Sequence, residues 1–134
     1  MKLTKRKSFR ICIAAALCVL IAGAFIFVNY MNGVNEYRDK VKNTLVPNVD
    51  ISSVPDGSYI GEYDVGLIYA KVEVLVEAGK IADISIIEHR NGRGATAESV
   101  IETMIAEQRI DVDAVSGATN SSTVLKKAVE LALT

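Results

Sequence analysis

An uninterrupted apolar segment near the N-terminus constrains this chain more than any other feature. Ile11 to Val28 (ICIAAALCVLIAGAFIFV) is a run of eighteen residues without a charged or strongly polar side chain. At about 1.5 Å per residue, a helix of this length spans about 27 Å, close to the thickness of the hydrocarbon layer of a bilayer. We therefore expect residues 11–30 to form a transmembrane anchor, preceded by a basic segment at residues 1–10.

The charges on either side of this segment predict its orientation. Residues 1–10 carry five cations and no acid, whereas residues 31–134 hold the other ten cations and all sixteen acids, a net charge of −6. Because cationic flanks stay in the cytoplasm, we expect a single-pass protein of the cell membrane with a cytoplasmic N-terminus and an extracytoplasmic domain. The competing interpretation is a signal peptide cleaved near Ala22-Gly23-Ala24. The apolar run continues through Phe25–Val28, which favours an uncleaved anchor.

The composition of the exported part argues against several kinds of site. Its acidic charge disfavours nucleic acid as a partner, since phosphate binding needs a clustered cationic face. Cys12 and Cys18 are the two cysteines of the chain, and both lie in the apolar run, where they point in different directions on a helix. The exported part therefore offers no disulfide and no thiolate, and its single histidine, His89, argues against structural zinc. We expect no metal site.

The rest of the chain divides into a tether and one domain. Both prolines and several polar residues mark residues 31–55 as a tether, and residues 56–134 are expected to fold. Three strands are predicted, at residues 58–63, 67–77 and 80–88. A tight turn at Ala78-Gly79 joins the last two strands as an antiparallel hairpin. We therefore expect a three-stranded meander or a larger sheet.

Alternation of side chains predicts the buried face of this sheet. The inward residues are expected to be Val72, Val74 and Val76 on the second strand, and Ala82, Ile84 and Ile86 on the third. Charged residues such as Lys71 and Glu73 fall on the opposite face of the second strand.

Two amphipathic helices are predicted after the strands. The stripe of the first, at residues 97–108, consists of Val100, Ile101, Met104 and Ile105. The second is expected to begin near Ser121 or Ser122, both good N-cap residues. Its buried residues are expected to be Val124, Leu125, Ala128, Val129 and Ala132. The expected fold is α+β, a small antiparallel sheet with two helices packed on it and one transmembrane helix before it.

The loop between the two helices carries the chemistry predicted for this chain. It reads DAVSGATNSS from Asp113, a small and hydroxyl-rich sequence that runs into a helix N-terminus. Gly117 allows a tight turn, and Ala118 leaves room for close approach. The groups expected to converge are the first free helix N–H groups and the hydroxyls of Thr119, Ser121 and Ser122. Because the helix dipole favours an anion, the loop predicts a phosphate site; the alternative is an ordinary capped helix after a turn.

A resemblance to a known family sharpens this interpretation. Asp113-Ala-Val-Ser-Gly-Ala-Thr119 resembles the Asp-x-x-Ser/Thr-Gly-Ala-Thr/Ser signature of the FMN-binding domain family. That family includes subunits C and G of the bacterial sodium-translocating NADH:quinone reductase and of the related Rnf complex. The resemblance also includes Asp56-Gly-Ser-Tyr-Ile-Gly61, the strand from Lys71, and Glu88-His89. It covers about residues 56–134.

The resemblance implies a cofactor and a way of holding it. In that family the last Thr of the signature carries FMN through a phosphoester bond, installed outside the cytoplasmic membrane by a magnesium-dependent flavin transferase. The implied attachment residue is Thr119, and the implied cofactor-binding residues beside it are Ser116, Gly117, Ala118, Ser121 and Ser122. The transferase would recognise Asp113, Ser116, Gly117, Ala118 and Thr119. No catalytic residue is implied.

Other residues near the expected flavin have two interpretations each. His89 is interpreted either as a neighbour of the flavin or, as is usual at a strand end, as a solvated surface residue. Arg90 or Arg93 would stabilise a reduced, anionic flavin, and Gly92-Arg93-Gly94 would let the backbone approach the ring; the alternative is a flexible loop. Tyr59, Tyr63 and Tyr69 either stack on the ring or complete the edge of the core.

These observations predict a membrane-anchored, extracytoplasmic electron carrier with FMN on Thr119. The isoalloxazine ring would do the electron chemistry while the protein supplies position and polarity. The expected partners are the flavin transferase and a membrane electron donor, either a quinol or a redox complex. The alternatives are a small flavin-dependent reductase with its own soluble substrate and a flavin-free anchored interaction module.

Overall fold

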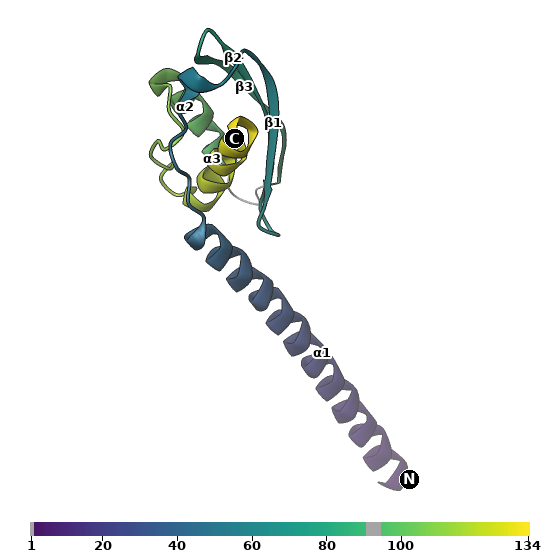
Figure 1. Cartoon of the computed structure of the whole chain (residues 1–134). Helices are drawn as coiled ribbons and strands as arrows, with labels where there is room; N and C mark the ends of the chain where they lie inside the picture. Colours follow the sequence, from purple (N-terminus) through teal and green to yellow (C-terminus); the bar gives the residue numbers. More distant parts are fainter. Residues whose placement is uncertain (1, 91–94) are drawn as a thin grey trace. The chain divides into compact units, whose positions relative to one another are not determined.

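The N-terminal part of the chain forms one long helix in the computed structural model, which describes residues 2–90 and 95–134 (Figure 1). This helix, α1, runs over Lys2–Asn43 and contains the whole apolar segment. Its most apolar window has a mean hydropathy of 3.0, and none of that window is buried. Among the described residues, α1 alone is long and apolar enough to cross a membrane, so the structure is compatible with the expected anchor.

The larger of the two compact units of the chain comprises Glu36–Thr134 and so includes the end of α1. Val41, in the last turns of that helix, is buried in the core of this unit. Beyond α1, the 3-10 helix η1 (Ile51–Ser53) buries Ile51 in the same core. Part of the segment 31–55 therefore packs on the folded unit, and the helix continues through the first part of that segment.

The folded unit contains one antiparallel sheet, as the alternation of the sequence predicts. Its strands are β1 (Gly57–Asp64), β2 (Tyr69–Glu77) and β3 (Lys80–Arg90), in the order β1-β2-β3. Ala78 and Gly79 join β2 to β3 with φ of 51° and 72°. Two positive φ values in a two-residue loop are typical of a type I′ turn, whose twist matches that of the strands. The predicted meander is confirmed.

The buried face of the sheet agrees with the prediction on β2 and departs from it on β3. Val72, Val74 and Val76 have no exposed surface. On β3, Ala82 is exposed and Ile81 is buried instead, so the prediction for Ala82 was wrong. The register shifts between Leu75 and Val76, which leaves one extra residue on β3 and turns the side chains beyond it to the opposite faces.

Both helices that follow pack on one face of this sheet (Figure 1). The 3-10 helix η2 (Ala95–Ser99) leads into α2 (Val100–Glu107), and α3 (Thr119–Leu133) ends the chain. α2 contacts β3, whereas α3 contacts β1 and β2. The predicted buried residues of α3 are confirmed, and so are Val100, Ile101 and Met104 of α2. The molecule therefore has the predicted α+β fold.

The backbone of α3 lies directly against β1 at Gly61. A Cβ atom added to Gly61 would lie 2.1 Å from the carbonyl oxygen of Ala128 and 2.5 Å from the amide nitrogen of Ala132. Because both neighbours are backbone atoms of one helix, neither can rotate away to make room. Because Gly61 has no side chain, the backbone of α3 can pack directly against the backbone of β1.

We expect Gly61→Ala to lower the free energy of unfolding by about 1–3 kcal/mol, because the added methyl group overpacks the contact and pushes α3 away from β1. Urea denaturation of the full chain in detergent, followed by circular dichroism, measures this change. Gly33→Ala is the matched control, since nothing lies within 4 Å of the Cβ that it would add. An unchanged urea midpoint for Gly61→Ala would contradict the assigned packing.

Candidate functional site

The loop that leads into α3 alternates between buried anchors and exposed residues. Val112 is 2% exposed and Ala118 is 6% exposed, so both ends of the loop are fixed in the core. Asp113, Ser116 and Gly117 between them are exposed. Their backbone is thus held from both sides while their polar groups face the solvent.

A tight turn at Ser116-Gly117 brings the chain to the helix. The N–H of Ala118 donates to the carbonyl oxygen of Val115 at 3.0 Å and closes the turn. Gly117 has a φ of +80°, a left-handed conformation that glycine adopts without steric cost. The space around Gly117 is open, because a Cβ added there would meet no atom within 4 Å.

Helix α3 begins at Thr119, two residues before Ser121 and three before Ser122, the predicted N-cap positions. Its N-cap residue is Ala118, and no side chain caps the helix, so the prediction of a serine cap was wrong. Among the described residues, no acceptor bonds the backbone N–H groups of Thr119, Asn120 and Ser121. These three N–H groups and the positive end of the helix dipole create a favourable environment for an anion.

The serine expected to cap the helix instead bonds the preceding loop. The hydroxyl of Ser122 donates to the carbonyl oxygen of Ala118 at 2.8 Å and accepts the N–H of Val115 at 3.0 Å. Ser122 is fully buried, and Ser121 is 3% exposed. The side chain of Ser122 therefore shapes the turn, and within the first turn of α3 the exposed hydroxyl is that of Thr119. The roles of Ser121 and Ser122 toward a cofactor remain predictions.

A lysine from the next turns of α3 holds the other end of the loop. The ammonium of Lys126 donates to the carbonyl oxygen of Val112 at 2.8 Å. Desolvation lowers the pKa of Lys126, and the nearby carboxylates of Asp113 and Asp111 partly offset this shift. Neither the sequence periodicity nor the motif pointed to this lysine.

The basic and imidazole candidates have partners inside the domain. The side chain of His89 is 2% exposed, with Nδ1 2.9 Å from Oε1 of Glu98, so the expectation of a solvated histidine was wrong. The guanidinium of Arg90 stacks on the Tyr69 ring, 5.6 Å from its centroid, and donates to the carbonyl oxygen of Gly66 at 3.1 Å. Arg90 therefore braces the turn between β1 and β2. Gly92, Arg93 and Gly94 lie outside the described residues.

The three strand tyrosines hydrogen-bond to other parts of the domain. Tyr59 donates to the carbonyl oxygen of Pro55 at 2.7 Å, and the hydroxyls of Tyr63 and Thr44 are 2.8 Å apart. Tyr69 donates to Glu62 at 2.8 Å. This bond, with a smaller effect of desolvation, raises the pKa of Tyr69 to about 12. These contacts favour the interpretation of the tyrosines as completing the edge of the domain.

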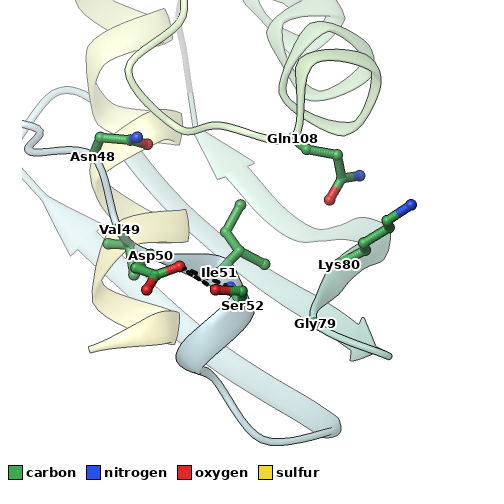
Figure 2. Close-up of a pocket in the computed structure, with 8 residues that line it drawn as sticks. All are labelled: Asn48, Val49, Asp50, Ile51, Ser52, Gly79, Lys80 and Gln108. Atoms are coloured by element: carbon green, nitrogen blue, oxygen red, sulfur yellow. Dashed lines mark hydrogen bonds between the residues drawn. The ribbon is translucent and has the colours of Figure 1, made fainter.

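A separate polar pocket is lined by the segment around η1, the turn between β2 and β3, and the residue after α2 (Figure 2). The amide of Gln108 borders it and pairs with the backbone of Ile81 in both directions, at 2.8 and 2.9 Å. The lining residues are Asn48, Val49, Asp50, Ile51, Ser52, Gly79, Lys80 and Gln108. None of them belongs to the predicted cofactor-binding residues, so this pocket and the loop before α3 are different places.

The loop before α3 fits a phosphate ester in its donor chemistry. An exposed threonine hydroxyl stands beside three N–H groups that lack an acceptor among the described residues. Gly117 leaves open space on the solvent side of the loop, whereas Ala118, directly before the helix, is buried. A diester phosphate carries one negative charge, which the start of a helix can stabilise.

Comparison with known protein families identifies a flavin-binding domain in the folded part of the chain. The FMN-binding domain family matches residues 66–134, a range that begins after β1 and includes the whole of the motif from Asp113 to Thr119. No curated protein and no solved structure matches the chain.

We expect Ser122→Ala to lower the free energy of unfolding by about 1–3 kcal/mol, because it leaves the partly buried N–H of Val115 without its acceptor. The neighbouring Ser121→Ala is the matched control, since the described residues offer the Ser121 hydroxyl no hydrogen bond. Urea denaturation of both variants makes the comparison. Equal stabilities would contradict the role assigned to Ser122.

Proposed function

This chain belongs to the FMN-binding domain family, and from that premise we propose that it is a membrane-anchored, extracytoplasmic electron carrier with FMN bound covalently to Thr119. One observation carries the attachment site. Thr119 combines an exposed hydroxyl with a position at the uncapped start of α3, next to the open turn at Gly117. Thr119 is also the last residue of the motif shared with the family.

The attachment reaction needs an activated flavin phosphate, because a free phosphate monoester does not esterify a hydroxyl in water unaided. A flavin dinucleotide supplies this activation in its pyrophosphate bond. The Oγ1 atom of Thr119 forms a bond to the phosphorus on the flavin side, the bond from that phosphorus to the bridging oxygen breaks, and a nucleoside monophosphate leaves. The hydroxyl proton passes to a base of the transferase, and nothing is oxidised or reduced.

In the product, this chain's own groups hold the phosphodiester. The N–H groups of Thr119, Asn120 and Ser121 are the donors that would stabilise its negative charge. The exposed position of Ser116 and Gly117 allows a transferase to reach the loop. When bound, FMN supplies electron transfer through its isoalloxazine ring.

A covalent bond suits the proposed location of the domain. The basic residues before the apolar segment and the acidic residues after it support a cytoplasmic N-terminus and an exported domain. Outside the membrane, an FMN that dissociates could not be replaced from the cytoplasmic pool. The bond to Thr119 prevents that dissociation. The anchor keeps the carrier near a membrane electron donor, either a quinol or a redox complex.

We expect Thr119→Ala to abolish covalent flavin. The wild-type chain, produced together with an active flavin transferase, should give a fluorescent band on a denaturing gel, because only a covalent bond survives denaturation. Thr123→Ala is the matched control: it removes a hydroxyl one turn further along α3 that bonds the carbonyl oxygen of Thr119 at 3.0 Å. This variant should stay fluorescent.

A dark wild-type band, obtained with a transferase that labels another target, would refute the proposed attachment. A fluorescent band for Thr119→Ala would refute the assignment to this residue.

The orientation has its own test in the chain's two cysteines, which both lie in the apolar run. We replace them by alanine and introduce either Ser85→Cys on β3 or Ser8→Cys near the N-terminus, both exposed positions. A maleimide that cannot cross membranes should label Ser85→Cys on intact cells and Ser8→Cys only after permeabilisation. The reverse pattern would contradict an extracytoplasmic domain.

A further inference from the structure

Two side chains of α3 reach back to the loop that precedes the helix. Ser122 and Lys126 are four residues apart, so they lie on the same face of the helix. The hydroxyl of Ser122 accepts the N–H of Val115, and the ammonium of Lys126 donates to the carbonyl oxygen of Val112. The loop is therefore bonded to the helix at two points three residues apart.

Asp113 lies between these two points and is exposed. Among the described residues, its carboxylate has no hydrogen bond or ion pair, so the backbone on either side sets its position. The neighbouring Asp111 differs, because its carboxylate is 3.2 Å from Nε of Arg109. The positive charge of Lys126 interacts electrostatically with the carboxylate of Asp113.

We propose that Lys126 is a positioning residue for flavin attachment, which holds the backbone at Val112 so that Asp113 is presented to the flavin transferase. This inference rests on the proposed function. Lys126 lies two turns beyond Thr119 on α3 and is bonded to the loop, so it acts through Asp113 and does not react itself.

A lysine is well suited to bond the carbonyl oxygen of Val112. A hydrogen bond from a charged donor to a carbonyl is stronger than one between neutral groups. The long side chain is partly buried and still brings its charge to the loop. The same ammonium attracts the nearby carboxylates of Asp113 and Asp111.

The test measures flavin attachment to the full chain in detergent, with purified transferase, magnesium and a flavin dinucleotide. The first variant, Lys126→Met, keeps the length of the side chain and removes the donor. Lys126→Arg restores a charged donor. Lys80→Met is the matched control, because Lys80 is an exposed lysine at the start of β3, outside the motif.

We expect Lys126→Met to lower kcat/KM for the acceptor protein about tenfold, through a higher KM with a nearly unchanged kcat. Lys126→Arg should recover most of this loss, and Lys80→Met should behave as wild type. Urea denaturation of each variant separates this effect from a loss of folding. If Lys126→Met does not fold, Lys126→Gln takes its place, since its amide still donates but carries no charge.

Wild-type KM and kcat in the folded Lys126→Met variant would overturn the inference, and so would an arginine variant no better than methionine. Both results leave flavin attachment itself intact. A wild-type chain that accepts no flavin from an active transferase refutes the proposed function instead, so the two failures are distinguishable.

Discussion

The contact between Gly61 and the backbone of α3 is the constraint on which the rest of the domain depends. It seats the helix at Ala128 and Ala132, in its second half, where no side chain separates strand from helix. The first half of the same helix carries Thr119 and the uncapped N–H groups. Because a helix is rigid along its length, the contact with β1 that fixes the second half of α3 also fixes the position of the Thr119 hydroxyl at its first residue.

At the beginning of α3 the chain is stabilised without covering the backbone N–H groups of the first turn. An ordinary N-cap side chain would stabilise the helix and at the same time occupy the N–H groups that an anion needs. Here the hydroxyl of Ser122 stabilises the turn from the buried side, and the N–H groups of the first turn face no protein acceptor in the described chain. The loop is thus ordered while its donors stay available.

Periodicity predicted most of the fold, and the motif predicted the family; the assignment of cofactor-binding residues stays a prediction. The alternating valines of β2 and the stripe of α3 followed directly from burial of one face, and the chain does belong to the predicted family. The error at Ala82 came from a β-bulge, which depends on how β3 pairs with β2 and not on local alternation. The misplaced N-cap had a similar cause: Ser122 bonds a loop residue seven positions earlier, a contact set by tertiary structure. The partner of His89, Glu98, likewise comes from a different element.

We propose that one hydroxyl, that of Thr119, carries the flavin phosphate. Tandem mass spectrometry of a protease digest tests this most directly, on protein made with an active flavin transferase. We expect a peptide heavier by FMN minus one water, with fragments that assign the added mass to Thr119. An unmodified Thr119 peptide, or the added mass on another residue, would contradict it.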